Sequence, residues 1–154
     1  MRIAVLLSQK DTAEFTKRFV DDGEKFIRLM KVHRPHWQYD NVPVMDGVFP
    51  TDFSNYDGFV ITGSTASVHD DALWIGRLEQ LIIEIDHAQL PLFGACFGHQ
   101  IIAKALGGKV GNNPHGWSLG TAVTEFYQNR PWMTPHQASV NHCLLYTSPS
   151  PRDS

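Results

Sequence analysis

The stretch LPLFGACFGHQ, residues 90–100, places a cysteine between a short apolar run and a segment with helical character. Apolar residues at successive positions are typical of a strand that is buried on both faces, as in a parallel sheet. Residues 97–106 predict a helix that ends at a pair of glycines. Cys96 therefore lies at a turn from strand to helix, and Gly94 and Gly98 stand two residues to either side.

The spacing G-x-C-x-G is the cysteine form of the nucleophile elbow. A helix that begins beside the cysteine directs its backbone N–H groups at the sulfur, which favours the thiolate and stabilises an oxyanion. This makes Cys96 a candidate nucleophile and the N–H of Phe97 a candidate oxyanion donor. Gly63, at the end of another apolar run, is the second candidate donor. The alternatives are a buried cysteine that packs as a small apolar residue and an ordinary strand-ending glycine.

Outward from this turn, apolar patterning alternates between the two periods of strand and helix. Strands are predicted at residues 3–7, 37–42, 57–63 and 90–95, with an alternating strand at 117–127. Helices are predicted from a cap at Asp11 or Thr12 to about residue 32, from a cap at Asp70 or Asp71 along an apolar face that starts at Leu73, and at 97–106. Such alternation predicts an α/β fold with an open, mostly parallel sheet and flanking helices.

The composition excludes several classes of protein. A formal net charge of −3 in 154 residues argues against a nucleic-acid partner, because phosphate contacts need a basic excess. Two cysteines exclude a disulfide scaffold and a four-cysteine zinc site, and the histidines lack metal-ligand spacing. No apolar run is long enough to span a membrane, and the first residues lack a signal-peptide pattern. We therefore expect a cytoplasmic protein without a membrane partner, a metal or a cofactor.

The last residues need a separate interpretation. Residues 143–153 read CLLYTSPSPRD, which is identical to one translated frame of a transposase sequencing adapter. The alternative is a natural tail rich in serine and proline. We expect residues 143–154 to be non-native and to form no regular structure. Residues 1–142 would then be an incomplete domain whose C-terminal part is missing.

Three segments resemble a class I glutamine amidotransferase domain: YDGFVITGS at 56–64, PLFGACFGHQ at 91–100 and ALGG at 105–108. The resemblance runs from the first strand to about residue 126. SVHDD at 67–71, Trp74 and GWSLG at 116–120 look most like the stand-alone, GMP-synthase-like branch. The resemblance implies a flavodoxin-like fold and a glutaminase whose cysteine attacks the side-chain amide of L-glutamine. Ammonia leaves, and water hydrolyses the γ-glutamyl thioester.

Carried onto this sequence, the family's site has Cys96 as nucleophile and the N–H groups of Gly63 and Phe97 as oxyanion donors. The resemblance also implies that four residues position the substrate: Gln100, Trp117, Ser118 and Leu119.

The sequence departs from the family at the catalytic base. The family's catalytic His and Glu lie on an H-x-E segment after the elbow, and these 154 residues contain no such segment. His99 follows the cysteine on the elbow helix and is expected to point away from the sulfur. His115, His136 and His142 are expected in loops. We therefore expect the chain as it stands to be almost inactive.

Two other functions remain open at this stage. One is hydrolysis of γ-glutamyl bonds on the same fold, and the other is a non-catalytic binding or regulatory role. The acceptor of the ammonia and a partner synthetase are not encoded in any pattern of the sequence.

Overall fold

The computed structural model describes residues 1–9, 14, 18–112, 118–120, 141–143 and 145–147. Its centre is a four-stranded sheet in the order β2-β1-β3-β4, and all neighbouring strands run parallel. The strands are β1 (Arg2–Leu6), β2 (Gln38–Val42), β3 (Gly58–Ile61) and β4 (Leu92–Gly94). The predicted open, parallel sheet is thereby confirmed.

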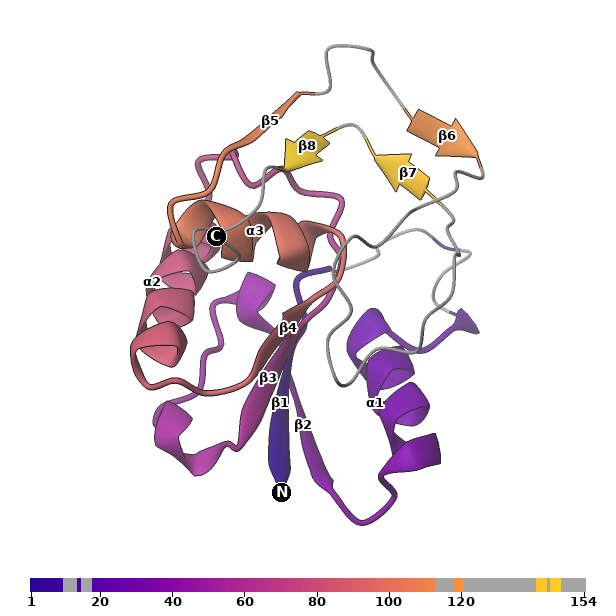
Figure 1. The fold of residues 1–154 in the computed structure, drawn as a ribbon. Coiled ribbons are helices and arrows are strands. Elements are labelled where there is room, and N and C mark those ends of the chain that lie inside the picture. The colour runs from indigo at the N-terminus through magenta and orange to yellow at the C-terminus, as the bar shows by residue number, and fades with distance from the viewer. Residues whose placement is uncertain (10–13, 15–17, 113–117, 121–140, 144, 148–154) are drawn as a thin grey trace, which may run out of the picture.

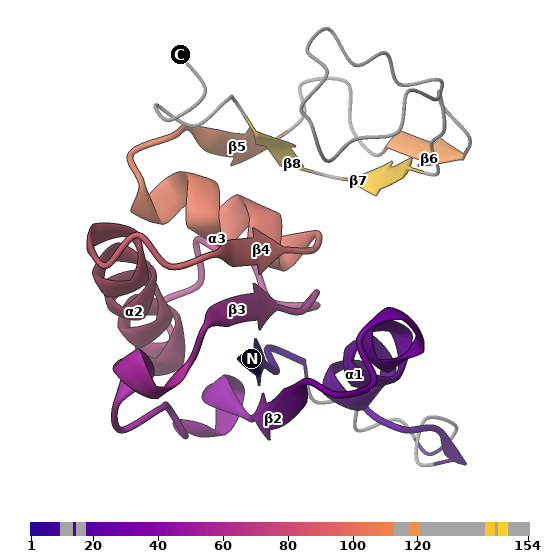
Figure 2. The same ribbon diagram turned by 60° about the horizontal axis from the view of Figure 1, so that its bottom comes forward.

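Three helices cover the two faces of this sheet. Helix α1 (Asp22–His33) lies on one face, and α2 (Leu73–His87) and α3 (Phe97–Ala105) lie on the other (Figure 1; Figure 2). Each layer has its own buried cluster, one on the side of α1 and a larger one on the side of α2 and α3.

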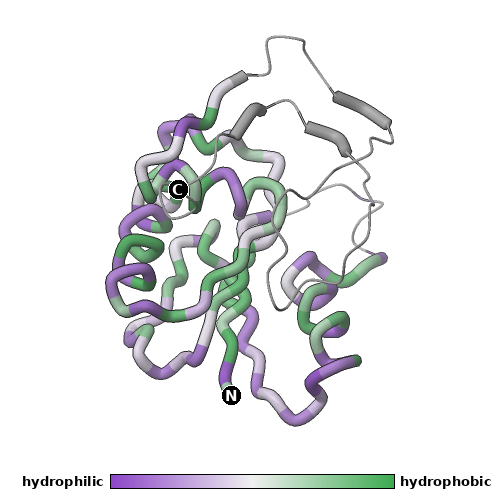
Figure 3. Tube along the Cα trace, viewed as in Figure 1, coloured by the Kyte–Doolittle hydropathy of each residue, from purple (hydrophilic) through white to green (hydrophobic). Residues whose placement is uncertain are grey.

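The side chains of β1 show why the central strands have apolar residues at successive positions of the sequence. Ala4 and Leu6 pack in the cluster beneath α2 and α3, whereas Ile3 and Val5 pack in the cluster beneath α1. Successive side chains of a strand point to opposite faces, so a sheet covered on both faces needs apolar residues at every position. Figure 3 accordingly shows hydrophobic residues concentrated along the central strands.

The predicted start of the first helix was wrong. The expected caps, Asp11 and Thr12, lie outside the described residues, and α1 begins only at Asp22. Its cap is Asp21, whose carboxylate accepts the N–H three residues further on at 2.8 Å and the side-chain amide of Asn41 at 2.9 Å. The helix thus starts where it can be joined to β2, a contact that apolar spacing cannot reveal.

The second helix also begins without the expected acidic cap. Ala72 is the residue before α2 and forms no side-chain hydrogen bond, whereas the carboxylate of Asp70 accepts the N–H of Ser67 at 2.8 Å. Leu73 is 97% exposed, so it is not part of the buried face. The rest of that face is confirmed as Ile75, Leu78, Leu81, Ile82 and Ile85.

Beyond α3 the chain forms short antiparallel pairs outside the central sheet (Figure 1). β5 (Val110–Asn112) pairs with β8 (Leu145–Thr147), and β6 (Ser118–Gly120) pairs with β7 (Asn141–Cys143). No pattern in the sequence predicted β5, and of the strand predicted at 117–127 the structure describes residues 118–120, as β6.

Two expectations about this region are corrected. His142 lies in β7, opposite Leu119 of β6, and not in a loop. Cys143 and residues 145–147 lie in strands, so the expected lack of regular structure does not hold for them. The physical reason is that strand pairing uses backbone groups. An extended segment can therefore join the edge of β5 or β6 without a specific side-chain pattern.

A polar cluster ties the first three strands together at the other end of the sheet. The Tyr56 hydroxyl donates to Asp40 Oδ2 at 2.8 Å, and an Arg2 guanidinium nitrogen lies 2.7 Å from the same oxygen. Burial raises the pKa of Tyr56 above its usual 10.0, and the hydrogen bond to Asp40 adds to the effect. The cluster therefore favours the neutral phenol in the folded chain.

We expect this cluster to contribute to the free energy of unfolding, and we expect that contribution to be lost at alkaline pH. Because the folded-state pKa of Tyr56 is raised, its contribution is complete below pH about 10 and disappears as pH rises through the folded value. Tyr56→Phe should lower the free energy of unfolding by about 1 kcal/mol at pH 8, and this difference from the unaltered chain should shrink above pH 10. Urea unfolding at pH 8 and pH 11 measures this. A difference that is independent of pH would contradict it.

Candidate active site

The turn between β4 and α3 carries the candidate nucleophile. β4 ends at Gly94, α3 begins at Phe97, and Cys96 lies between them with φ of 51° and ψ of −107°. A cysteine at positive φ is strained, and such strain typically costs about 1–3 kcal/mol and gathers at functional sites. The side chain of Cys96 is exposed. The predicted elbow is thus present in its backbone geometry.

Two glycines let the elbow sit directly on the sheet. A Cβ on Gly94 would overlap the carbonyl group of Gly98, and a Cβ on Gly98 would lie 2.5 Å from the carbonyl oxygen of Ile61. Hydrogen bonds hold the same contact: the Ala95 N–H donates to Ile61 O at 3.0 Å, and the Gly98 N–H donates to Ala95 O at 2.8 Å. The start of α3 is therefore fixed against the carboxyl end of β3.

We expect Gly98→Ala to be strongly destabilising for this reason. The new Cβ meets backbone atoms of Ile61, which cannot move aside without disturbing β3. The cost should be about 1–3 kcal/mol, measured by urea unfolding. The matched control is Gly76→Ala in α2, where no atom lies within 4 Å of the new Cβ. That change should stabilise the chain by about 0.5–1 kcal/mol, and equal effects at both sites would contradict the close packing of the elbow.

Gly63 lies beside the cysteine, as the sequence predicted. A Cβ built on Gly63 would stand 3.9 Å from Cys96 Cβ, in ordinary van der Waals contact. The neighbouring Thr62 is fully buried, and its hydroxyl oxygen accepts the Ser8 N–H at 2.9 Å and donates to Gly63 O at 3.1 Å. The carboxyl ends of β1, β3 and β4 thus meet around Cys96, where open α/β sheets bind their ligands.

The backbone N–H groups of Gly63 and Phe97 are available in this arrangement. Neither donates a hydrogen bond to another residue in the described part of the chain. Phe97 is the first residue of α3, where N–H groups have no partner within the helix. Two backbone donors therefore belong to residues that adjoin Cys96, an arrangement that can stabilise an oxyanion.

The residues predicted to position the substrate lie on different elements of the structure. Gln100 belongs to α3 and is 7% exposed, and its N–H donates to Cys96 O at 3.0 Å. Ser118 and Leu119 lie in β6, and Trp117 lies outside the described residues. Only Gln100 is therefore placed on the element that begins at the elbow.

Two histidines can be placed near the elements that carry the elbow. His99 is exposed on α3, and His69 has its Nε2 3.0 Å from the carbonyl oxygen of Val110. No group of three or more His, Cys, Asp or Glu side chains in the described residues could hold a metal ion.

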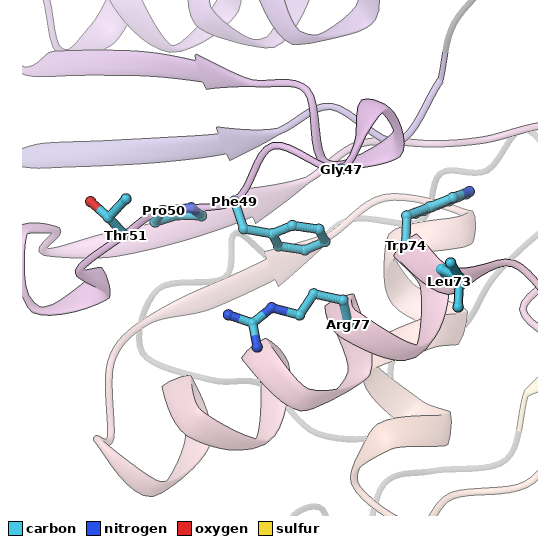
Figure 4. Close-up of a pocket in the computed structure, with 7 residues that line it drawn as sticks. All are labelled: Gly47, Phe49, Pro50, Thr51, Leu73, Trp74 and Arg77. Atoms are coloured by element: carbon cyan, nitrogen blue, oxygen red, sulfur yellow. The ribbon is translucent and has the colours of Figure 1, made fainter.

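A hollow of about 420 Å³ lies between the β2–β3 connection and α2 (Figure 4). Phe49 of the β2–β3 connection and Arg77 of α2 face each other across it, with the guanidinium 5.7 Å from the ring centre. Trp74 lines the hollow and also packs on Phe97, with ring centres 5.5 Å apart. Trp74 therefore packs against the first residue of α3.

One group of polar contacts on the helix that carries the elbow has no signature in the sequence. The Lys104 ammonium lies 2.6 Å from Val68 O and 2.6 Å from Glu79 Oε1, which joins α3, α2 and the loop after β3. Glu79 and Val68 precede the lysine by 25 and 36 positions and form no motif with it, so no signal in the sequence could have found these contacts.

Comparisons with known proteins agree with this geometry. Residues 13–148 match the family model described as glutamine amidotransferase class-I. Gamma-glutamyl peptidase 3 of Arabidopsis thaliana is 44% identical over 121 residues, which are 77% of this chain and 48% of that protein. GMP synthase [glutamine-hydrolyzing] of Wolbachia pipientis wMel is 30% identical over 97 residues, or 59% of this chain and 18% of that protein.

The fold has a counterpart among solved structures. A crystal structure of a glutamine amidotransferase from Thermotoga maritima aligns with a TM-score of 0.77 and 19% identity, covering 98% of this chain and 64% of that one. The chain spans about half the length of the Arabidopsis relative. In the described residues, none of the helices combines the length and the apolar character needed to cross a membrane.

Proposed function

Because the chain belongs to the glutamine amidotransferase class-I family, we propose that the full-length enzyme opens γ-glutamyl C–N bonds with Cys96 as nucleophile. The observation that supports this best is the strained, exposed cysteine at the β4–α3 elbow beside Gly63. A merely structural cysteine needs neither the positive φ nor the exposure.

The proposed reaction follows from the groups around the sulfur. The thiolate attacks the γ-carbonyl carbon, and the N–H groups of Gly63 and Phe97 donate to the resulting oxyanion. The C–N bond then breaks, and the nitrogen leaves as ammonia or an amine after it takes a proton. Water opens the γ-glutamyl thioester, which releases the acid and restores the thiol.

Four residues are proposed to hold the glutamyl group during these steps: Gln100, Trp117, Ser118 and Leu119. Support for Gln100 comes from its place on α3, one turn after the cysteine. The other three rest on the family resemblance of the GWSLG segment.

A γ-glutamyl peptide is the first candidate substrate. The relative named gamma-glutamyl peptidase 3 shares 44% identity with this chain, against 30% for the GMP synthase. L-Glutamine is the second candidate, which the family description and the GMP synthase favour. In that case ammonia passes to an acceptor or a partner synthetase. For either substrate we propose a cytoplasmic enzyme that needs no cofactor, nucleic acid or membrane.

The experiment is a substrate comparison on the full-length enzyme. Equal concentrations of glutamine and a γ-glutamyl dipeptide are supplied, and the released ammonia and amine are quantified over time. Faster release of the amine would support the peptidase, and faster release of ammonia would support the glutaminase. An enzyme that hydrolyses neither, although it is folded, would refute the proposal and favour a binding role.

We also propose that residues 1–142 are an incomplete amidotransferase domain and that residues 143–154 are derived from sequencing adapter. The support is the unbroken identity of CLLYTSPSPRD with the translated adapter. Sequencing the uninterrupted gene beyond the codon for His142 tests this, and an H-x-E segment there would support the enzyme.

A further inference from the structure

The loop after β3 carries Gly63 at its start and is held by Gln9 from the segment after β1 and by Ser64 of the loop itself. Gln9 Oε1 accepts the Thr65 N–H at 2.7 Å, and Ser64 Oγ accepts the Ala66 N–H at 3.1 Å. These two bonds shape the first half of the loop. They do not by themselves set where the loop lies relative to α3, which carries the sulfur.

Lys104 makes the connection between that loop and α3. Its ammonium donates to Val68 O at 2.6 Å, and Val68 is fully buried. Cys96 precedes the first residue of α3 and Lys104 lies in its last turn, so one rigid helix joins the sulfur to the ammonium. A backbone carbonyl five residues after Gly63 is thereby tied to the nucleophile's own helix.

Glu79 of α2 keeps the ammonium in place. Its Oε1 lies 2.6 Å from Lys104 Nζ, and the two side chains are only 25% and 34% exposed. Glu79 therefore offsets part of the cost of bringing the lysine charge out of water. Three elements, α2, α3 and the loop after β3, meet at this one ammonium group.

We propose that Lys104 is a positioning residue that fixes the Gly63 N–H relative to the Cys96 sulfur, with Glu79 orienting it. This rests on the proposed function, because it assigns Gly63 to the oxyanion. An oxyanion donor acts only when it is close to its ideal position, so a displaced loop lowers stabilisation of the oxyanion while the thiol stays reactive.

Two reagents separate these effects on the 154-residue chain. A chloromethyl ketone analogue of glutamine forms an oxyanion when the thiolate adds to its carbonyl carbon, and the sulfur then displaces chloride from the neighbouring carbon. Iodoacetamide is attacked at a saturated carbon, loses iodide and forms no oxyanion. Lys104→Met should slow labelling of Cys96 by the ketone about 10-fold or more, and change the iodoacetamide rate less than about twofold, because the thiolate itself is untouched. Mass spectrometry of the Cys96 peptide gives both rates.

Three further variants complete the test. Lys104→Arg keeps the charge and the donors, so it should restore most of the ketone rate. Glu79→Gln keeps an acceptor but loses the charge, so it should lie in between. Lys25→Met is the matched control: Lys25 pairs with Asp22 at 2.8 Å on α1, far from the elbow in sequence, and neither rate should change.

The outcomes can be told apart. Equal slowing of both reagents in Lys104→Met, or slowing of neither, would overturn the positioning role. Hydrogen exchange of the amides at 63–68 is an independent measure and should be faster in Lys104→Met than in Lys25→Met. If the unaltered chain reacts with iodoacetamide but not with the ketone, the proposed function fails. In that case the proposal that Lys104 positions the loop is tested by hydrogen exchange at 63–68 alone. Equal exchange rates in Lys104→Met and Lys25→Met would overturn it.

Discussion

Cys96→Ser in the full-length enzyme is expected to lower kcat for its γ-glutamyl substrate by roughly 10⁴- to 10⁶-fold, as removal of a covalent nucleophile does elsewhere. The serine hydroxyl stays protonated at neutral pH, so it cannot replace the thiolate that attacks the carbonyl carbon. The change adds no bulk to a side chain that is already exposed. Far-UV circular dichroism should therefore be unchanged, and retained turnover would end the assignment of Cys96 as nucleophile.

A second substitution at the same position separates function from structure. Cys96→Gly should abolish turnover equally and yet raise the free energy of unfolding by about 1 kcal/mol, because glycine adopts the φ of 51° without strain. Urea unfolding measures the gain. A loss of stability would mean that the cysteine side chain contributes packing that outweighs the strain of its backbone.

The elbow could be predicted because its determinants are local. An apolar run, two glycines and a cysteine at fixed spacing describe a strand, a close approach of backbones and a helix start, all within residues 90–100. The proximity of Gly63 and Cys96 needed one further rule, that the carboxyl ends of parallel strands meet at one edge of the sheet. The structure places the two residues in that way.

Other features depend on tertiary contacts that leave no pattern in the sequence. The start of α1 is set by Asp21, because its carboxylate reaches both the helix and Asn41 of β2. Asp11 and Thr12 had equally suitable side chains, so propensity could not choose between the sites. Lys104 reads as an ordinary lysine near a helix end, and only the folded chain brings Val68 and Glu79 to its ammonium.

The 154-residue chain is expected to react with alkylating reagents at Cys96 but to turn over substrate very slowly. Cys96, the start of α3 and the Gly63 loop are all in place. Iodoacetamide should therefore label Cys96 faster than free cysteine at the same pH, because the side chain is exposed and the positive end of the α3 dipole lies beside it. Labelling rates measured side by side test this first half of the prediction.

Slow turnover follows from what the two chemical steps need after the attack. The leaving nitrogen must take a proton, and the thioester must be opened by an activated water molecule. Both tasks belong to an imidazole that these 154 residues do not supply in an H-x-E segment. Because general acid–base help is typically worth about 10²–10⁴-fold, ammonia or amine release should fall short of a full-length relative by at least that factor. Release at a comparable rate would refute the argument and would direct attention to His99, exposed on α3, or to His142 in β7 as the base.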